Sequence, residues 1–165
     1  MIIQKANIND HGIIMNIIRD AITDMVARGI DQWDDIYPNA EVIRNDLGAG
    51  TLYVCIDESI IKGIIVLNEY QDKEYQSLNW QYTSGKHLII HRLCIDPKYQ
   101  GHGIARLMVD FAEQYGRENH YQSIRLDAFI HNKRACKLYE QAGYGIAGTV
   151  TFRKGEFYCF EKGLA

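Results

Sequence analysis

The chain has 165 residues, a formal net charge of −3, 47% hydrophobic residues and 24% charged residues. This balance favours one domain over residues 1–165, and it excludes disordered, collagen-like and coiled-coil classes. No apolar run reaches the ~18 residues of a membrane helix, and "MIIQKANIND" shows no secretory signal. Lysine and arginine are scattered, which argues against a nucleic-acid partner. We therefore expect a cytoplasmic protein with neither a membrane nor a nucleic-acid partner.

In the N-terminal half, the pattern predicts a strand, two helices and two further strands. Residues 1–6 form the first strand, and a helix capped by Asn9 or Asp10 carries apolar residues at helical spacing until Gly29. A shorter helix is expected around residues 39–47. The segments "TLYVCID" and "IIKGIIVLNEY" then indicate two strands joined by a tight turn.

The middle of the chain changes from polar to apolar. Residues 71–86 are polar with interleaved aromatics, so we expect mostly loop there. The next segment, "HLIIHRLCI", is apolar with little alternation, which is typical of a central strand covered on both faces. Pro97 ends that strand, and an amphipathic helix begins near Ile104.

The C-terminal part predicts one more strand, a helix and a final pair of strands. "SIRLDAF" is the strand, Asn132 caps the helix, and Gly143 follows its end. Short strands are expected near residues 145–152 and 155–162. The order β–α–α–β–β–β–α–β–α–β–β indicates a mixed α/β fold.

Cysteine and histidine give no sign of a metal site. The four cysteines lie in apolar stretches without a CxxC pair, so we expect reduced, buried thiols. They are Cys55, Cys94, Cys136 and Cys159. His87 and His91 have zincin spacing, but the Glu of HExxH is missing. We therefore expect no metal.

The segment "DPKYQGHGIARLM" places Gly101 and Gly103 just ahead of a helical pattern. A helix start exposes unpaired N–H groups and the positive end of a dipole, so bare backbone there can face a phosphate. A tight turn without a ligand is the alternative. Arg106 stands where a dinucleotide fingerprint needs Gly or Ala, and "SGKH" does not complete a Walker loop.

Two segments carry a resemblance to a known family. "RLCIDPKYQGHGIARLM" resembles the acyl-CoA pyrophosphate motif of the GNAT superfamily, (Gln/Arg)-x-x-Gly-x-(Gly/Ala), through Gln100, Gly103 and Ala105. "LDAFIHNKRACKLYEQAGY" resembles the superfamily's second conserved block, and together the matches cover about residues 87–145. The resemblance implies a GNAT-like fold, with a central mixed, mostly antiparallel sheet flanked by helices.

The resemblance also implies an activity. The expected function is acetyl transfer from acetyl-CoA, without a metal, directly to a primary amine of an unidentified small molecule, protein or peptide. A catalytically silent acyl-CoA-binding sensor or interaction module is the alternative. A monomer and a homodimer are both compatible with the sequence.

The resemblance further implies a set of cofactor-binding residues. Strand backbone at residues 93–95 would pair with the pantetheine arm, and amides at residues 100–105 would hold the pyrophosphate. The alternatives are a solvent-facing helix residue for Arg106 and an ordinary N-cap for Asn132. The full set is Leu93, Cys94, Ile95, Gln100, Gly101, His102, Gly103, Ile104, Ala105, Arg106, Asn132 and Tyr139.

Acetyl transfer needs an oxyanion donor, a proton for the leaving thiolate and a base for the amine. The resemblance implies the Leu93 amide as the oxyanion donor and Tyr139 as the general acid, although Tyr139 also fits an apolar helix stripe. His91 is the candidate base, because an unperturbed histidine has a pKa of ~6.5. Ordered water is the alternative base, and a structural histidine is the alternative role.

In this fold the loop between the first two helices borders the acceptor, and here it contains "GIDQWDDIYP". Trp33 and Tyr37 would form an apolar wall, while Asp34, with Asp31 and Asp35, would attract a cationic amine. The alternative is a tryptophan that covers a helix end above a solvated acidic turn.

Overall fold

The computed structural model describes residues 1–165, and the chain divides into two compact units. The first unit comprises Met1–Leu67 and His91–Phe111, and the second comprises Asn68–Ile90 and Ala112–Ala165. Strand β4 (His87–Ile95) and helix α3 (Ile104–Glu118) contribute residues to both units. The expectation of one domain over the whole chain stays a prediction.

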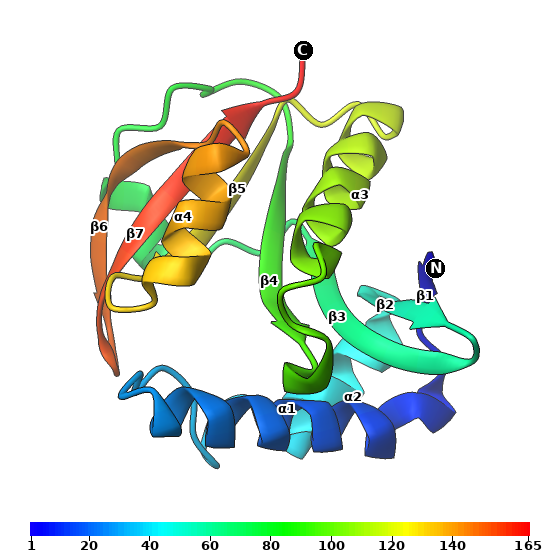
Figure 1. Ribbon diagram of the computed structural model, residues 1–165. Coiled ribbons are helices and arrows are strands. Elements are labelled where there is room, and N and C mark those ends of the chain that lie inside the picture. Colours follow the sequence, from blue (N-terminus) through cyan, green and yellow to red (C-terminus); the bar gives the residue numbers. More distant parts are fainter. The chain divides into compact units, whose positions relative to one another are not determined.

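The first unit carries the N-terminal strands and helices. Strands β1, β2 and β3 pair antiparallel in chain order, and helices α1 and α2 contact each other (Figure 1). The elements are β1 (Ile2–Lys5), the 3-10 helix η1 (Ile8–Asp10), α1 (His11–Ala27), α2 (Ala40–Ala49), β2 (Leu52–Asp57), β3 (Ile60–Asn68) and the 3-10 helix η3 (Pro97–Tyr99).

Apolar side chains on α1 build the core of this unit. They recur at helical spacing and are buried against α2, β2 and β3, which explains why this face of the helix is apolar. The core residues of α1 are Ile14, Ile17, Ile18 and Ala21. Asp10 occupies the N-cap position of α1, one of the two expected residues, but its side chain makes no capping bond, and Asn7 forms a capping box on η1.

The second unit contains the C-terminal sheet. Its elements are the 3-10 helix η2 (Lys73–Ser77), β5 (Ser123–Phe129), α4 (Lys133–Gln141), β6 (Gly145–Phe152) and β7 (Gly155–Gly163). Strands β5 and β6 pair antiparallel with β7, whereas β4 pairs parallel with β5. The strand order of the sheet is β1-β2-β3-β4-β5-β7-β6. The predicted mixed, mostly antiparallel sheet with helices is confirmed.

A buried ion pair holds the segment before β4 onto the sheet. Arg125 donates Nε to Glu161 Oε2 at 2.9 Å, with side-chain exposures of 7% and 4%. Glu161 Oε1 accepts from the Gln81 and Tyr82 amides, and Arg125 also donates to the Tyr82 carbonyl. Each member of the ion pair therefore also has a hydrogen-bond partner in the segment before β4, and buried charges need such partners because the protein interior solvates them poorly. Part of the segment predicted as loop is the 3-10 helix η2.

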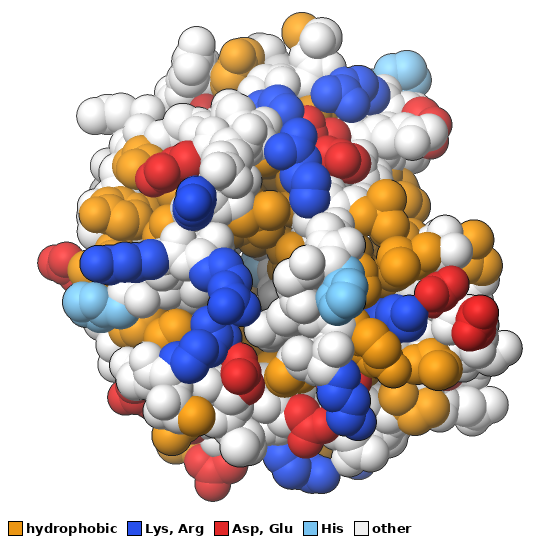
Figure 2. Space-filling view, viewed as in Figure 1, with side chains coloured by type: hydrophobic (Ala, Val, Ile, Leu, Met, Phe, Trp, Pro, Cys, Tyr) orange, Lys and Arg blue, Asp and Glu red, His pale blue; other side chains and the backbone are white.

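The surface carries both signs of charge. Basic and acidic side chains are interspersed over the face shown in Figure 2. None of the helices combines the length and the apolar character that crossing a membrane requires. All four cysteines are buried and free, which confirms that part of the expectation.

Candidate active site

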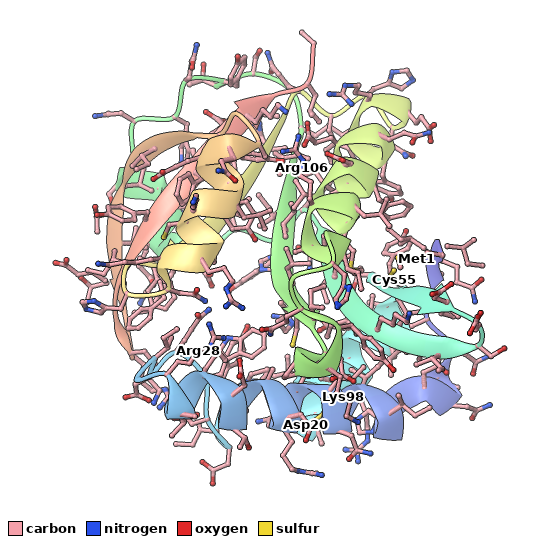
Figure 3. The ribbon with its side chains drawn as sticks, in the orientation of Figure 1. Met1, Asp20, Arg28, Cys55, Lys98 and Arg106 are labelled. Carbon is pink, nitrogen blue, oxygen red and sulfur yellow. The ribbon has the colours of Figure 1, made fainter.

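A glycine turn connects β4 to α3. Asp96 accepts a bond from the Lys98 amide and so begins η3, after which Gly101 and Gly103 adopt φ values of +80° and +79°. A Cβ built at either glycine meets no heavy atom within 4 Å. The left-handed conformation explains glycine here, and the open space leaves the backbone approachable from outside. Figure 3 labels Lys98 and Arg106, which flank this turn in the chain.

Helix α3 begins at Ile104, directly after the glycine turn. Leu107 N–H donates to the Gly103 carbonyl, which is the first helical bond of this ladder, and the first N–H groups of any helix have no acceptor within the helix. A helix of 15 residues also carries the positive end of its dipole at this place. Bare glycine backbone, open space and a helix N-terminus together fit a pyrophosphate. The residues of this chain thus suit acyl-CoA.

The side chains around the turn are held locally. Arg106 is exposed and its Nε donates to Asp110 Oδ1 at 2.9 Å. Gln100 Nε2 donates to the Ile95 carbonyl at 3.4 Å, while His102 is exposed. Among the other predicted residues of this segment, Ile104 is buried and Ala105 is half-buried.

The second half of β4 carries the predicted thioester contacts. His91 and Leu93 are half-buried, and Cys94 and Ile95 are buried. Between His91 and Leu93, Arg92 adopts a φ of +48°, a conformation that costs a non-glycine residue energy. Burial raises the pKa of the Cys94 thiol to about 12, so this sulfur stays protonated at neutral pH.

The Arg92 side chain joins three elements of the first unit. Its Nε and Nη2 donate to the two carboxylate oxygens of Asp46 on α2, both at 2.7 Å, and Nη1 donates to the Tyr37 hydroxyl at 2.8 Å. Side-chain exposures are 11% for Arg92 and 9% for Asp46. Sequence reasoning missed this pair. Its signal is an arginine within an apolar strand, because a buried guanidinium requires a carboxylate.

The predicted acceptor loop is a compact turn. Asp34 Oδ1 accepts from the Ile36 and Tyr37 amides, and Asp34 N–H donates to the Tyr37 carbonyl. Trp33 is half-buried and packs against the core of the first unit. The loop therefore brings Trp33, Asp34 and Tyr37 together, and Tyr37 reaches β4 through Arg92.

In the second unit, Asn132 and Tyr139 lie at opposite parts of α4. The Asn132 side chain accepts from the Ala135 amide at 3.2 Å, so the predicted N-cap is confirmed. Gly143 follows the helix with a φ of +90°, as expected for its C′ position. Tyr139 is 6% exposed, and its ring lies 5.7 Å from that of Phe160.

The environment of Tyr139 keeps its phenol protonated. Burial raises the pKa of Tyr139 above its ordinary value, and the nearby Asp127 carboxylate adds to the shift. The phenol is therefore protonated at neutral pH, as a proton donor must be, but the raised pKa makes it a weaker acid than a thiol, whose ordinary pKa is ~8.5.

A family model links the chain to known proteins. The model of the acetyltransferase (GNAT) family matches residues 16–144. The sequence has no match among curated proteins.

Solved structures share the fold. A GNAT-family acetyltransferase from Streptococcus agalactiae 2603 aligns with a TM-score of 0.86 at 23% identity, over 98% of this chain and 94% of that one. A GNAT-family acetyltransferase from Listeria monocytogenes 4b F2365 gives 0.79 at 22% identity, over 99% and 94%. The protein yncA of Salmonella typhimurium, solved with acetyl-CoA, gives 0.74 at 14% identity, over 100% and 94%. At these identities the likeness concerns the fold.

Proposed function

Because the chain belongs to the acetyltransferase (GNAT) family, we propose that it moves an acetyl group from acetyl-CoA directly to a primary amine of a small molecule or peptide. As a member of this family it is an acyltransferase. The observation that carries the proposal is the open glycine turn at Gly101 and Gly103, followed by the N-terminus of α3. Left-handed glycines at two alternate positions next to open space leave the backbone N–H groups of this turn approachable by an anion.

On the acetyl-CoA side, amides from Gly101 to Ala105 bind the pyrophosphate, and Arg106 adds a charge. The Gln100 amide, expected in the same set, instead donates to the Pro97 carbonyl at 3.4 Å. Backbone of Leu93, Cys94 and Ile95 pairs with the pantetheine arm, and Asn132 is a further candidate to bind this arm. Acetyl-CoA supplies an activated thioester. Direct transfer agrees with the raised pKa of Cys94, because a protonated thiol is a poor nucleophile.

At the reacting centre, each step has a candidate group. The Leu93 amide stabilises the oxyanion, and Tyr139 gives its proton to the departing thiolate. His91 or a water molecule receives the amine proton. The loop with Trp33, Asp34 and Tyr37 receives the acceptor.

Two measurements test the proposed function. Calorimetric titration with acetyl-CoA should show binding, and a panel of primary amines should give time-dependent release of the CoA thiol. Binding with no turnover over the panel would favour the silent module, and the absence of binding would reject both functions.

Tyr139→Phe tests the general acid. The change keeps the buried ring and removes the hydroxyl, so we expect kcat to fall by ~10²-fold, a typical acid–base contribution, while acetyl-CoA affinity stays the same. Tyr144→Phe is the matched control, because its ring lies 5.8 Å from that of Tyr139 and loses the same group. Equal kcat values for the two variants would return Tyr139 to a packing role.

Asp34→Asn combined with Asp35→Asn tests the acceptor loop. Asparagine keeps an oxygen that can accept the bonds of the turn, so the loop should retain its conformation. We expect KM to rise more for a diamine than for a monoamine, and the difference to shrink in high salt, where charges are screened within ~3 Å at 1 M. A flat KM across these conditions would show that the loop is structural.

A further inference from the structure

Strand β1 leaves one edge of the sheet open. It stands at one end of the strand order and pairs with β2 alone (Figure 1). The Ala6 amide donates to the Leu52 carbonyl at 2.9 Å, and in an antiparallel pair the backbone groups of successive residues face alternate sides. The N–H and C=O groups of Ile3 and Lys5 therefore face the open edge, where they can bond to a further strand.

A groove lies beside this edge. Its volume is about 560 Å³, and it is lined by residues of β1, of the start of α1 and of the hairpin between β2 and β3. Because Ile2 and Gln4 both line it, the groove lies on the face of β1 to which alternate residues point. All of the lining residues belong to the first unit.

The groove and the surface around it are rich in apolar side chains. Ile13 of α1 contributes to the lining, together with Ile56 and Ile61 of the hairpin. Four of the eleven exposed large hydrophobic side chains of the chain lie within residues 1–13, and these are Met1, Ile2, Ile8 and Ile13. Exposed apolar side chains concentrated beside unpaired strand backbone indicate a surface that binds an extended polypeptide.

The groove carries an excess of negative charge. Asp10, Asp57 and Glu58 contribute three carboxylates to its lining, and the N-terminal ammonium of Met1 contributes one cation. That ammonium lies 3.5 Å from the Asp57 carboxylate, which Lys62 Nζ also contacts at 2.8 Å. Both cations thus contact Asp57, and the excess negative charge lies at Asp10 and Glu58. A positively charged partner is favoured there.

The hairpin turn places one of these charges at a cost in stability. Glu58 and Ser59 are the two residues between β2 and β3, and they adopt φ values of +48° and +66°. A two-residue turn with both φ values positive favours Asn-Gly, so Glu and Ser are energetically unfavourable here. Local turn stability therefore does not explain the carboxylate of Glu58 beside the groove.

We propose that the open edge of β1 and the adjoining groove bind an extended segment of a partner polypeptide, with alternating apolar side chains and a flanking lysine or arginine. The segment adds a strand to β1 by bonding to the backbone of Ile3 and Lys5, and its apolar side chains enter the groove. Asp10 and Glu58 attract the basic residue. A second copy of this chain fits less well, because it would bring the same carboxylates together. The inference goes beyond acetyl transfer and does not depend on it.

Two blocked peptides test the proposal in the absence of acetyl-CoA. The probe is Lys-Val-Thr-Val-Thr-Val-Lys, and its acidic twin has glutamate in place of both lysines. At low salt, calorimetry should show that the probe binds and that the twin binds at least ~10-fold more weakly, because its charges repel those of the groove. In 1 M salt, where charges are screened within ~3 Å, the two affinities should approach each other. Equal affinities at low salt, or no binding of the probe, would overturn the proposal.

Hydrogen exchange shows where the probe binds. With saturating probe, the amides of Ile3 and Lys5 should exchange at least ~10-fold more slowly, because they gain acceptors. The Gln4 amide faces β2 and serves as the internal reference. Ile3→Pro removes a donor at the open edge without removing a bond to β2, so it should abolish probe binding in a variant that still melts cooperatively. Unchanged exchange at both edge amides would reject strand addition.

Glu58→Lys keeps the test decisive if Ile3→Pro does not fold. Reversing this exposed charge should lower the ratio of probe affinity to twin affinity by at least ~10-fold. Asp20→Lys is the matched control, because it makes the same charge change at an exposed position of α1 outside the groove and should leave the ratio unchanged. An equal ratio in wild type and Glu58→Lys would contradict the charge recognition. A dimer in sedimentation that protects Ile3 and Lys5 without peptide would identify a second copy as the occupant and overturn the proposal.

Discussion

Gly103→Val is expected to abolish the binding of acetyl-CoA. Wild-type protein should melt at a higher temperature with acetyl-CoA, because a ligand that binds only the folded state stabilises it by mass action. Valine at Gly103 places a branched side chain in the space that the structure leaves open, where the pyrophosphate would approach the amides. It also disfavours the φ of +79° on which the turn depends. The thermal shift should therefore disappear.

Gly29→Val is the matched control for backbone strain. Gly29 has a φ of +74° and the same open space at its Cβ, but it lies at the end of α1. Both variants should lose stability without ligand, since each forces valine into a left-handed conformation. Only Gly103→Val should lose the acetyl-CoA shift. If both variants keep the full shift, the pyrophosphate site lies elsewhere.

The sequence predicts most of the fold because local signals agree with the final contacts. Asn132 and Gly143 mark the two ends of α4 through short-range capping, which needs no knowledge of the rest of the chain. Apolar spacing likewise predicts α1 and its buried face. Where a segment depends on distant partners, prediction is weaker: η2 was expected as loop, and the segment containing it is held by Arg125 and Glu161.

In the candidate site, too, the features set by local sequence are predictable and those set by distant partners are not. The glycine turn is visible in sequence because conformation and spacing are local properties of Gly101 and Gly103. Asp127 meets Tyr75 from 52 positions away, and Arg92 meets Asp46 from 46. Such pairs depend on strand order and on the register of the sheet, which a single sequence does not specify. Sequence reasoning can ask which carboxylate a buried arginine needs, but only the fold identifies it.

Asp46→Ala is expected to lower the free energy of unfolding by ~3–5 kcal/mol, the typical cost of removing one partner of a buried ion pair. The substitution removes the carboxylate that neutralises the buried Arg92 guanidinium. The hydrogen bond from Arg92 to the Tyr37 hydroxyl remains, but a hydroxyl carries no charge. Most of the cost is thus the unpaired charge rather than the lost attraction. Urea denaturation measures the difference, and Asp110→Ala, which breaks the exposed pair with Arg106, should change it little.

The double variant Arg92→Met with Asp46→Leu separates the charge from the packing. Replacing both partners by apolar residues removes the unpaired charge, so its stability should lie well above that of Asp46→Ala. Together with the single variants Arg92→Met and Asp46→Leu it forms a double-mutant cycle, whose coupling energy should be large because the two side chains share both hydrogen bonds. Additive effects would mean that the pair contributes no specific coupling energy to stability.

The same double variant should have a lower kcat. The ion pair holds Arg92, which has a φ of +48°, directly before Leu93. Without the pair we expect the backbone to relax and to turn the Leu93 amide away from its expected direction. A full kcat in a stable double variant would show that the strand needs no such anchor.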